Sequence, residues 1–367
     1  MIKELRFRKE FTERLERKRD KMDFPRNVIF EITHQCNLRC RHCYVVPDSR
    51  KKELTTSQVK SVFKQLVDVG CLHLTLTGGE PLVRPDIISL IDYARRLGLF
   101  IHLFTNATLI NLEIADKLGE LSLTSLEISF HSLKPKRFDS FTRVEGSFDS
   151  VMKAIRLVKE RKESIALKIN ITKANLDEID DFKEFANDLD AVIEWGTILR
   201  PRNDGSQDNL SLRLEPEEAL KLGYMLGLES ILDEPIHNNK ECHPPENKLT
   251  KPNRNRIESE LFRCGIGSEG LVIDPYGELK PCLVLGLLGY SIFDSSLKQA
   301  WINLRADLNS MKPTADYKCL DCNLGHYCSS CPARAKLECN DMNSCPDYYR
   351  RLAELRCQNN GYKNSRI

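Results

Sequence analysis

The first half of the chain alternates short apolar runs with longer amphipathic stretches. Six strand-length runs rich in Ile, Leu, Val and Thr are found at residues 28–33, 72–77, 100–105, 125–130, 165–172 and 191–198. Between them, segments with helical apolar spacing are found at residues 55–70, 85–97, 111–121, 147–162 and 175–189. This alternation predicts an α/β fold with a parallel sheet and helices packed outside it, either doubly wound or a partial barrel. In both arrangements the chemistry lies at the carboxyl ends of the strands.

The pattern breaks after residue 200. A polar loop follows, and the pattern of residues 214–232 predicts one helix. Residues 238–255 are rich in Asn, Lys and Pro, which indicates an exposed connection. The chain is therefore predicted to consist of an N-terminal charged helix (1–25), the α/β part (26–200), a connecting helix and linker (201–263), a Cys-rich domain (264–357) and a flexible tail (358–367).

Composition and charge restrict the compartment and the partners. The 367 residues have a net charge of +2 and no large basic field, which argues against general nucleic-acid binding. The N-terminus lacks the apolar segment of a signal peptide, and the longest apolar stretch, residues 283–293, is too short to span a bilayer. We therefore expect a cytoplasmic protein that binds neither nucleic acid nor membranes. In a reducing compartment the 14 cysteines are not a disulfide framework.

Three cysteines near the start of the chain have the spacing C-x3-C-x2-C. They are Cys36, Cys40 and Cys43, and Tyr44 follows them. Iron–sulfur clusters normally take four Cys ligands, so a three-thiolate loop leaves one iron of a [4Fe–4S] cube open to bind and reduce a ligand. A structural zinc site, the main alternative, needs four ligands.

Glycine and polar residues follow the next strands. Gly78-Gly79-Glu80-Pro81 follows the second run and Thr105-Asn106 ends the third. The Gly-Gly turn would let a ligand approach the backbone closely. Across residues 25–200, these motifs and the C-x3-C-x2-C-aromatic loop resemble those of the radical S-adenosylmethionine (SAM) enzymes. The resemblance implies a partial (β/α)6 barrel in which a reduced cluster cleaves SAM to a 5′-deoxyadenosyl radical that abstracts hydrogen from a substrate. Such chemistry requires an oxygen-poor environment.

The same resemblance implies roles for single residues. The open iron would bind the amino and carboxylate groups of SAM, Glu80 and the Gly78–Gly79 backbone would hold its ammonium, and Tyr44 would lie near the adenine. Other implied cofactor contacts are Asn106, Ser129, Arg143 and Lys168. His131, after the fourth run, is interpreted as structural, and no catalytic side chain is identified.

The last hundred residues contain a second cysteine set. Its members are Cys264, Cys282, Cys319, Cys322, Cys328, Cys331 and Cys345. Their order resembles the SPASM extension of radical SAM proteins, which implies two auxiliary [4Fe–4S] clusters. The family's interleaving would give the first cluster Cys264, Cys282 and Cys331, and the second Cys319, Cys322, Cys328 and Cys345.

Four cysteines have no assigned place in this scheme. Cys242 is predicted as a further ligand of the first auxiliary cluster, with a free thiol as the alternative, and Cys339 is an alternative ligand of the second. Cys71 is interpreted as a small buried apolar group and Cys357 as spare. The two C-x2-C pairs would also fit a zinc ribbon, but the radical SAM motifs favour iron–sulfur clusters.

SPASM proteins act mostly on peptides or proteins, and auxiliary clusters suit net oxidations. We therefore expect an oxidoreductase that forms a thioether or C–C crosslink in a ribosomally made peptide. Leu283 follows Cys282 where sulfatase-maturing enzymes have Asp, so a formylglycine product is not expected. The alternatives are a cofactor-biosynthesis enzyme acting on a tetrapyrrole or quinone precursor and, from another class, a non-catalytic metal-binding adaptor. Expected partners are the peptide or protein substrate, flavodoxin or ferredoxin as electron donor, and a separate leader-peptide-binding protein.

Overall fold

The structure is a computed structural model. It describes residues 24–161, 164–227, 261–262, 264, 266, 270–320, 322–325 and 327–363. The predicted N-terminal helix, except residues 24–25, the linker residues 228–260 and Cys242 lie outside the described residues. No helix in the described ranges is long and apolar enough to cross a membrane.

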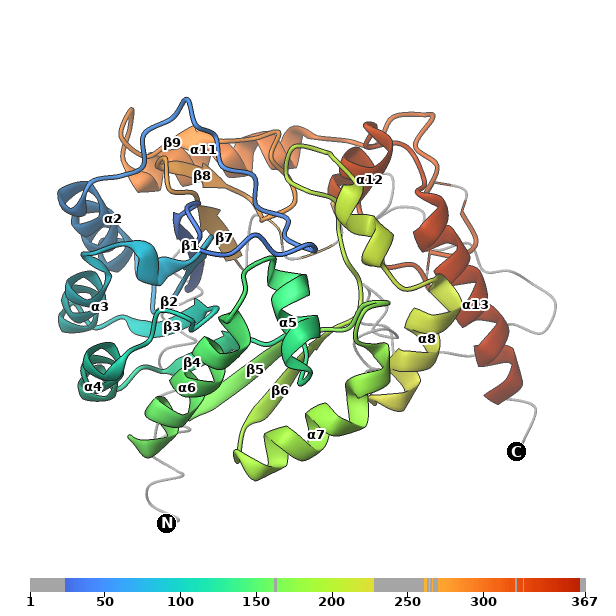
Figure 1. Cartoon of the computed structure of the whole chain (residues 1–367). Helices are drawn as coiled ribbons and strands as arrows, with labels where there is room; N and C mark the ends of the chain where they lie inside the picture. Colours follow the sequence, from blue (N-terminus) through green and yellow to red (C-terminus); the bar gives the residue numbers. More distant parts are fainter. Residues whose placement is uncertain are drawn as a thin grey trace, which may run out of the picture.

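Six parallel strands form the centre of the molecule and neighbour one another in chain order (Figure 1). They are β1 (Asn27–Thr33), β2 (His73–Gly78), β3 (Phe100–Thr105), β4 (Ser125–Ser129), β5 (Ile165–Asn170) and β6 (Val192–Gly196). A doubly wound sheet would reverse its strand order at a switch point, whereas the order of these six strands never reverses. The partial barrel is therefore confirmed, and of the two arrangements that the apolar pattern allowed, the doubly wound sheet is excluded.

Five helices cover the outside of these strands (Figure 1). They are α2 (Thr56–Asp68), α3 (Ile87–Arg96), α4 (Leu112–Leu121), α6 (Ser147–Glu160) and α7 (Ile179–Asp188). The first of them begins where the sequence predicts, because Thr55 and Gln58 form a capping box. Its apolar face (Val59, Val62, Phe63 and Leu66) is fully buried. Short 3-10 turns are found at Pro81–Val83, Leu176–Glu178 and Asp208–Leu212.

The Cys-rich region extends the same sheet. β7 (Gly270–Ile273) pairs in parallel with β1, and β8 (Glu278–Lys280) and β9 (Tyr290–Ser291) continue antiparallel from it. The helix α11 (Leu297–Ser310) packs against α2, and the backbone of Leu297 donates to the Gln65 side chain at 2.9 Å. This shared sheet places the start of the Cys-rich region beside the first strand of the barrel.

The remaining helices were either not predicted from the sequence or were predicted with the wrong ends. α5 (Pro135–Thr142) was not predicted. α8 (Pro216–Met225) ends earlier than expected, and Gly227 follows with a left-handed φ of 63°. α12 (Pro332–Cys339) precedes α13 (Asp347–Lys363). The tail predicted as flexible from residue 358 is helical up to Lys363, because the helix is already anchored upstream by buried Tyr349, Leu352 and Ala353.

Candidate active site

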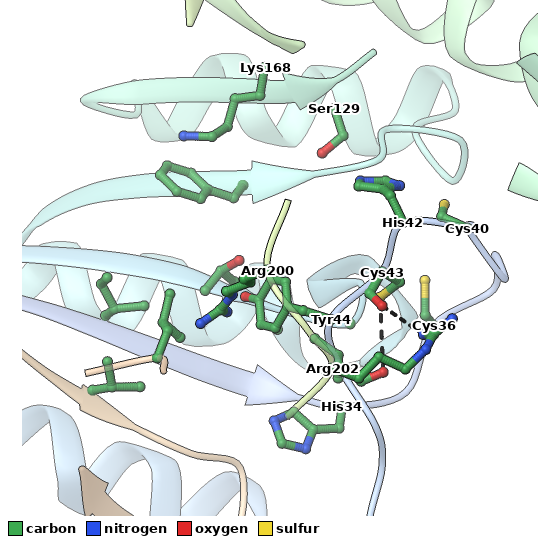
Figure 2. Close-up of a pocket in the computed structure, with 18 of the residues that line it drawn as sticks. His34, Cys36, Cys40, His42, Cys43, Tyr44, Ser129, Lys168, Arg200 and Arg202 are labelled. Carbon is green, nitrogen blue, oxygen red and sulfur yellow. Dashed lines mark hydrogen bonds between the residues drawn. The ribbon is translucent and has the colours of Figure 1, made fainter. Parts of the chain in front are cut away.

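A cavity of about 1350 Å³ opens at the carboxyl ends of the strands. Its wall combines the Cys36–Cys43 loop, the ends of β2 to β5, the segment after β6, and residues on either side of β7 and β8 (Figure 2). Ligand cavities usually measure roughly 300–1,000 Å³. The cavity is therefore large enough for a cofactor together with part of a substrate.

The cysteine loop is held from two sides by backbone hydrogen bonds. Arg39 and Arg41 donate their backbone N–H groups to the carbonyls of Thr142 and Phe141, at 3.0 and 2.9 Å, at the end of α5. On the opposite side the Arg202 guanidinium donates to the Cys43 carbonyl at 2.6 Å. The loop is thus positioned by a helix and an arginine that the sequence reading did not select.

The Gly78-Gly79 turn packs directly against the residues that precede the first cysteine. A Cβ atom at Gly78 would lie 2.0 Å from the Thr33 carbonyl oxygen, and one at Gly79 would lie 2.2 Å from that of Gln35. Gly79 and Glu80 donate their N–H groups to the same two carbonyls, at 2.7 and 2.8 Å. The chain's own backbone occupies the space at these Cβ positions, while Gly78 and Gly79 also line the cavity, and their backbone contact with the SAM ammonium stays a prediction. The glycines therefore fix the start of the cysteine loop.

The three thiols of the loop lie close enough to influence one another (Figure 2). Burial raises the pKa of Cys36 to about 11, and the neighbouring Cys43 thiolate also raises it. Burial raises the pKa of Cys40 too, followed by the thiolates of Cys43 and Cys36. Among the described residues no three ligand side chains converge on a single metal ion, whereas each thiolate of an iron–sulfur cube binds its own iron. An all-thiol donor set spread around one space fits such a cube.

Glu80 is fully buried and makes three hydrogen bonds. Its carboxylate accepts from the Thr105 hydroxyl at 2.7 Å, the Asn106 backbone N–H at 2.6 Å and the Leu82 N–H at 3.0 Å. Burial raises its pKa to about 6, although these donors oppose the shift. The carboxylate thus joins the second and third strand ends. Its contact with the SAM ammonium stays a prediction, since its side chain is not part of the cavity wall.

Replacing Glu80 with glutamine should lower the free energy of unfolding by about 1–3 kcal/mol, because the amide NH₂ group would face N–H donors. Chemical denaturation of the purified protein measures this change. Glu113→Gln, at a largely exposed side chain of α4, is the matched control and should change stability by less than about 0.5 kcal/mol. Unchanged stability with weakened SAM binding would instead favour direct contact of Glu80 with the ammonium.

Tyr44 is stacked by a residue that the sequence reading missed. The Arg200 guanidinium lies over the Tyr44 ring, 3.8 Å from its centroid (Figure 2). Burial raises the pKa of the Tyr44 hydroxyl, and the Glu31 carboxylate adds to the shift. Arg200 and Arg202 lie in the segment that follows β6, and their position after a strand of the predicted barrel was the signal available for finding them.

The other predicted SAM contacts lie in the cavity wall but differ in their interactions with neighbouring residues. Asn106, Ser129, Arg143 and Lys168 all line the cavity. The Asn106 amide lies 3.8 Å from the Cys36 sulfur. Lys168 is committed to ion pairs with Glu127 at 2.8 Å and Glu194 at 2.6 Å. The structure brings these residues to one site, and their contacts with SAM stay predictions.

His131 packs among aromatic rings beneath the cysteine loop. Its ring stacks on Phe141 with centroids 4.7 Å apart and meets the His42 ring at 4.9 Å. Burial lowers the pKa of His131 well below its usual range, and His42 adds to this shift. The ring is packed, but its buried Nδ1 has no hydrogen-bond partner among the described residues and the residue lines the cavity, so the structural role of His131 stays a prediction.

The second cysteine set separates into two groups in space. Burial and then the Cys331 thiolate raise the pKa of Cys264, and burial and then the Cys282 thiolate raise that of Cys331. These thiols are the ones that the resemblance assigns to the first auxiliary cluster, and their role as its ligands stays a prediction. Cys264 and Cys282 also line the cavity that contains the first loop.

The second group lies around Cys328 and Cys345. Burial raises the pKa of Cys345 to about 11, and the thiolates of Cys328, Cys319 and Cys322 raise it further. Burial, Cys319 and Cys322 likewise raise the pKa of Cys328, whose sulfur accepts the Ser330 N–H at 3.4 Å. Four mutually close thiols fit a fully ligated cube. Their role as cluster ligands stays a prediction.

The three unassigned cysteines within the described residues lie elsewhere. Cys71 is buried, and its thiol donates to the carbonyls of Arg26 and His73, both at 3.4 Å. Cys339, at the end of α12, is exposed, and Cys357 lies within α13. Cys242, the predicted extra ligand of the first auxiliary cluster, lies outside the described residues.

The family model of the Radical SAM superfamily matches residues 30–189, which span β1 to α7. The chain contains a radical SAM domain. This family uses a [4Fe–4S] cluster and SAM, as the cysteine loop predicted. The Cys-rich region after the radical SAM domain is consistent with a SPASM extension.

Two curated relatives match most of the chain. The AdoMet-dependent heme synthase of Methanosarcina barkeri is 27% identical over 325 residues, which cover 85% of this chain and 92% of the relative. The mycofactocin maturase MftC of Mycobacterium tuberculosis is 26% identical over 312 residues, covering 83% and 77%. Streptococcus suis SuiB bound to its precursor peptide SuiA shares the fold, with a TM-score of 0.65 at 17% identity over 93% of this chain and 79% of SuiB.

Proposed function

We propose that the protein is a radical SAM oxidoreductase that modifies a peptide, forming a thioether or C–C crosslink. The observation that carries the proposal is the cavity, whose wall includes both the Cys36–Cys43 loop and the Cys264 and Cys282 thiols. A site that generates a radical and a site that exchanges electrons would then serve one substrate. The names of MftC as a maturase and of SuiB in complex with a precursor peptide support a peptide as that substrate.

The family's cluster and SAM, when bound, supply a radical that removes hydrogen from carbon. Cys36, Cys40 and Cys43 would hold the cluster, and the Gly78-Gly79 turn would keep their loop in register with the sheet. Apolar side chains of the wall, such as Leu38, Phe104 and Leu199, would keep water and competing hydrogen donors from the reacting carbon.

The finer assignments belong to the same proposal. Cys264, Cys282 and Cys331 would hold one auxiliary [4Fe–4S] cluster, with Cys242 as a further ligand, and Cys319, Cys322, Cys328 and Cys345 would hold the other. Flavodoxin or ferredoxin would deliver the electron, and a separate protein would bind the leader peptide. The pairwise influence of the thiols on one another supports this division.

A tetrapyrrole is the second candidate substrate. The observation that favours it is the match to the heme synthase, which extends over 92% of that enzyme. The fold and the cysteine loop serve either substrate, because the radical chemistry belongs to the cofactor.

The deciding experiment is anaerobic incubation of the reconstituted enzyme with SAM, a reductant and candidate substrates, followed by mass spectrometry. A peptide that loses the mass of two hydrogen atoms for each SAM cleaved supports the proposal. Modification of a tetrapyrrole with every peptide left intact would transfer the function to the second candidate.

Cys322→Ala is the informative variant in this assay. It should retain SAM cleavage at the first loop and lose product, because only the second auxiliary group is broken. Full turnover by this variant would show that the second group is not used for electron transfer.

A further inference from the structure

The charges on the cavity wall are all of one sign. The described residues that line it include no Asp or Glu, and its basic residues are Arg39, Arg143, Lys168, Arg200 and Arg202. Lys168 is neutralised by Glu127 and Glu194, and Arg202 by Asp208 at 2.6 Å. The other three arginines face no carboxylate at ion-pair distance among the described residues.

The cofactors themselves do not balance this charge. A [4Fe–4S] cube in its resting state, held by three thiolates, carries about one net negative charge, and SAM carries about one net positive charge, so together they are close to neutral. The auxiliary cluster proposed at Cys264, Cys282 and Cys331 would add about one or two negative charges, which is fewer than the three positive charges of these arginines. Arg39 belongs to the cysteine loop, and Arg143 ends the helix on which that loop docks, so both lie on the cluster side. Arg200 enters from the β6 side of the cavity.

Arg200 is built as a recognition residue. Its guanidinium is oriented by the Tyr44 ring at 3.8 Å, and its buried Nη1 atom has no hydrogen-bond partner. A buried guanidinium nitrogen without a partner is costly. Because Nη1 itself is covered, a substrate carboxylate would approach the Arg200 side chain where it lines the cavity, and no ion pair with the described residues occupies the guanidinium there. Its place after a barrel strand is where substrates of such folds bind. The Glu31 carboxylate also acts on Tyr44. Its Oε2 contacts His34 at 3.3 Å and its buried Oε1 has no hydrogen-bond partner among the described residues, but Glu31 forms no ion pair with Arg200.

We propose that Arg200 binds a carboxylate of the substrate and makes the enzyme selective for anionic substrates. The inference rests on the proposed function, since it concerns the substrate of the same cavity. Both candidate classes can supply the group, as acidic side chains of a peptide or as carboxylate substituents of a tetrapyrrole.

The test measures equilibrium binding to the anaerobically reconstituted enzyme with SAM present. The probes are two matched pairs: a short peptide with two Glu residues and its Gln twin, and a porphyrin carrying carboxylates and its amide twin. For one pair, wild-type enzyme should bind the carboxylate form about 10- to 100-fold more tightly, as expected for a charge-assisted bidentate contact. The pair that shows the preference identifies the source of the carboxylate.

Arg200→Gln should reduce this preference to about onefold, and Arg200→Lys should retain part of it, because lysine keeps the charge but loses the planar fork. Arg96→Gln, at an exposed side chain of α3, is the control and should keep the wild-type preference. Iron content shows that each variant is folded and reconstituted.

Three results would overturn the proposal. The first is that the wild type binds both members of each pair equally, and the second is that Arg200→Gln keeps the preference. The third is that the double variant Glu31→Gln/Arg200→Gln regains the full preference. This result would mean that Arg200 acts only by neutralising the repulsion between Glu31 and the substrate carboxylate. Failure of the proposed peptide modification is seen separately, by mass spectrometry, and leaves this binding measurement intact.

Discussion

Cys40→Ala is expected to abolish SAM cleavage and to lower the iron content by about four atoms from about twelve per chain, as expected for loss of one cube of three. Cys40 is the middle cysteine of the loop, and its thiol is influenced by both Cys43 and Cys36. Only two thiolates would remain to hold the cube, which would leave two irons without a protein ligand, and the cube would be lost. Iron and sulfide analysis and chromatographic measurement of 5′-deoxyadenosine after dithionite reduction provide the readouts.

Cys71→Ala provides the control for this loss. Cys71 is buried between α2 and β2, away from the cavity, and serves as a small packed group. Its replacement should keep all the iron and the SAM cleavage, with a modest loss of stability. Retention of SAM cleavage in Cys40→Ala would contradict the ligand assignment of the loop.

Gly78→Ala is expected to have the second largest effect. The residue has a φ of 132°, a conformation that side chains rarely adopt, and its new Cβ would lie 2.0 Å from the Thr33 carbonyl oxygen. The strained backbone and the clash each cost about 1–3 kcal/mol. We therefore expect a loss of roughly 2–6 kcal/mol in the free energy of unfolding, and poor cluster loading, because the clash displaces the start of the cysteine loop.

Gly98→Ala separates the clash from the strain. Gly98 has a φ of 91°, but a Cβ there would meet no atom within 4 Å. This variant should lose only the conformational part, about 1–3 kcal/mol, and keep its iron. Denaturation curves and iron content of the two variants give the comparison. Equal losses of stability and full iron in both would show that the turn does not position the loop.

The strand and helix pattern of the barrel could be predicted because its elements are local. Alternating apolar runs set the strands, and the capping residue Thr55 set the start of α2. The short helix α5 was missed, because Pro135 follows the fourth strand closely and the segment is too short to show helical periodicity. The strands β7 to β9 were missed because they are two to four residues long and are stabilised by pairing with β1 and with each other.

The residues of the candidate site likewise include some that could be predicted from the sequence and some that could not. The ligand loop Cys36–Cys43 is contiguous in sequence, so its chemistry could be predicted from spacing alone. The contact of Gly78 and Gly79 with residues 33–35 could not be predicted, because this close approach depends on two strands lying side by side. Arg200 carries no motif: its position after a barrel strand was the only signal in the sequence, and its place over Tyr44 is visible only in the structure.

The sequence by itself therefore determined the class of cofactor, because three thiols within eight residues can be brought together by one loop. It also determined the parallel strand–helix architecture, because periodicity records which faces are buried. Tertiary structure decided that the sheet forms a partial barrel rather than a doubly wound sheet. It also placed Cys264 and Cys282 in the same cavity as the first cysteine loop and gave that cavity its excess of positive charge. These features depend on contacts between residues that are distant in the chain, such as Tyr44 and Arg200, and no local pattern in the chain records them.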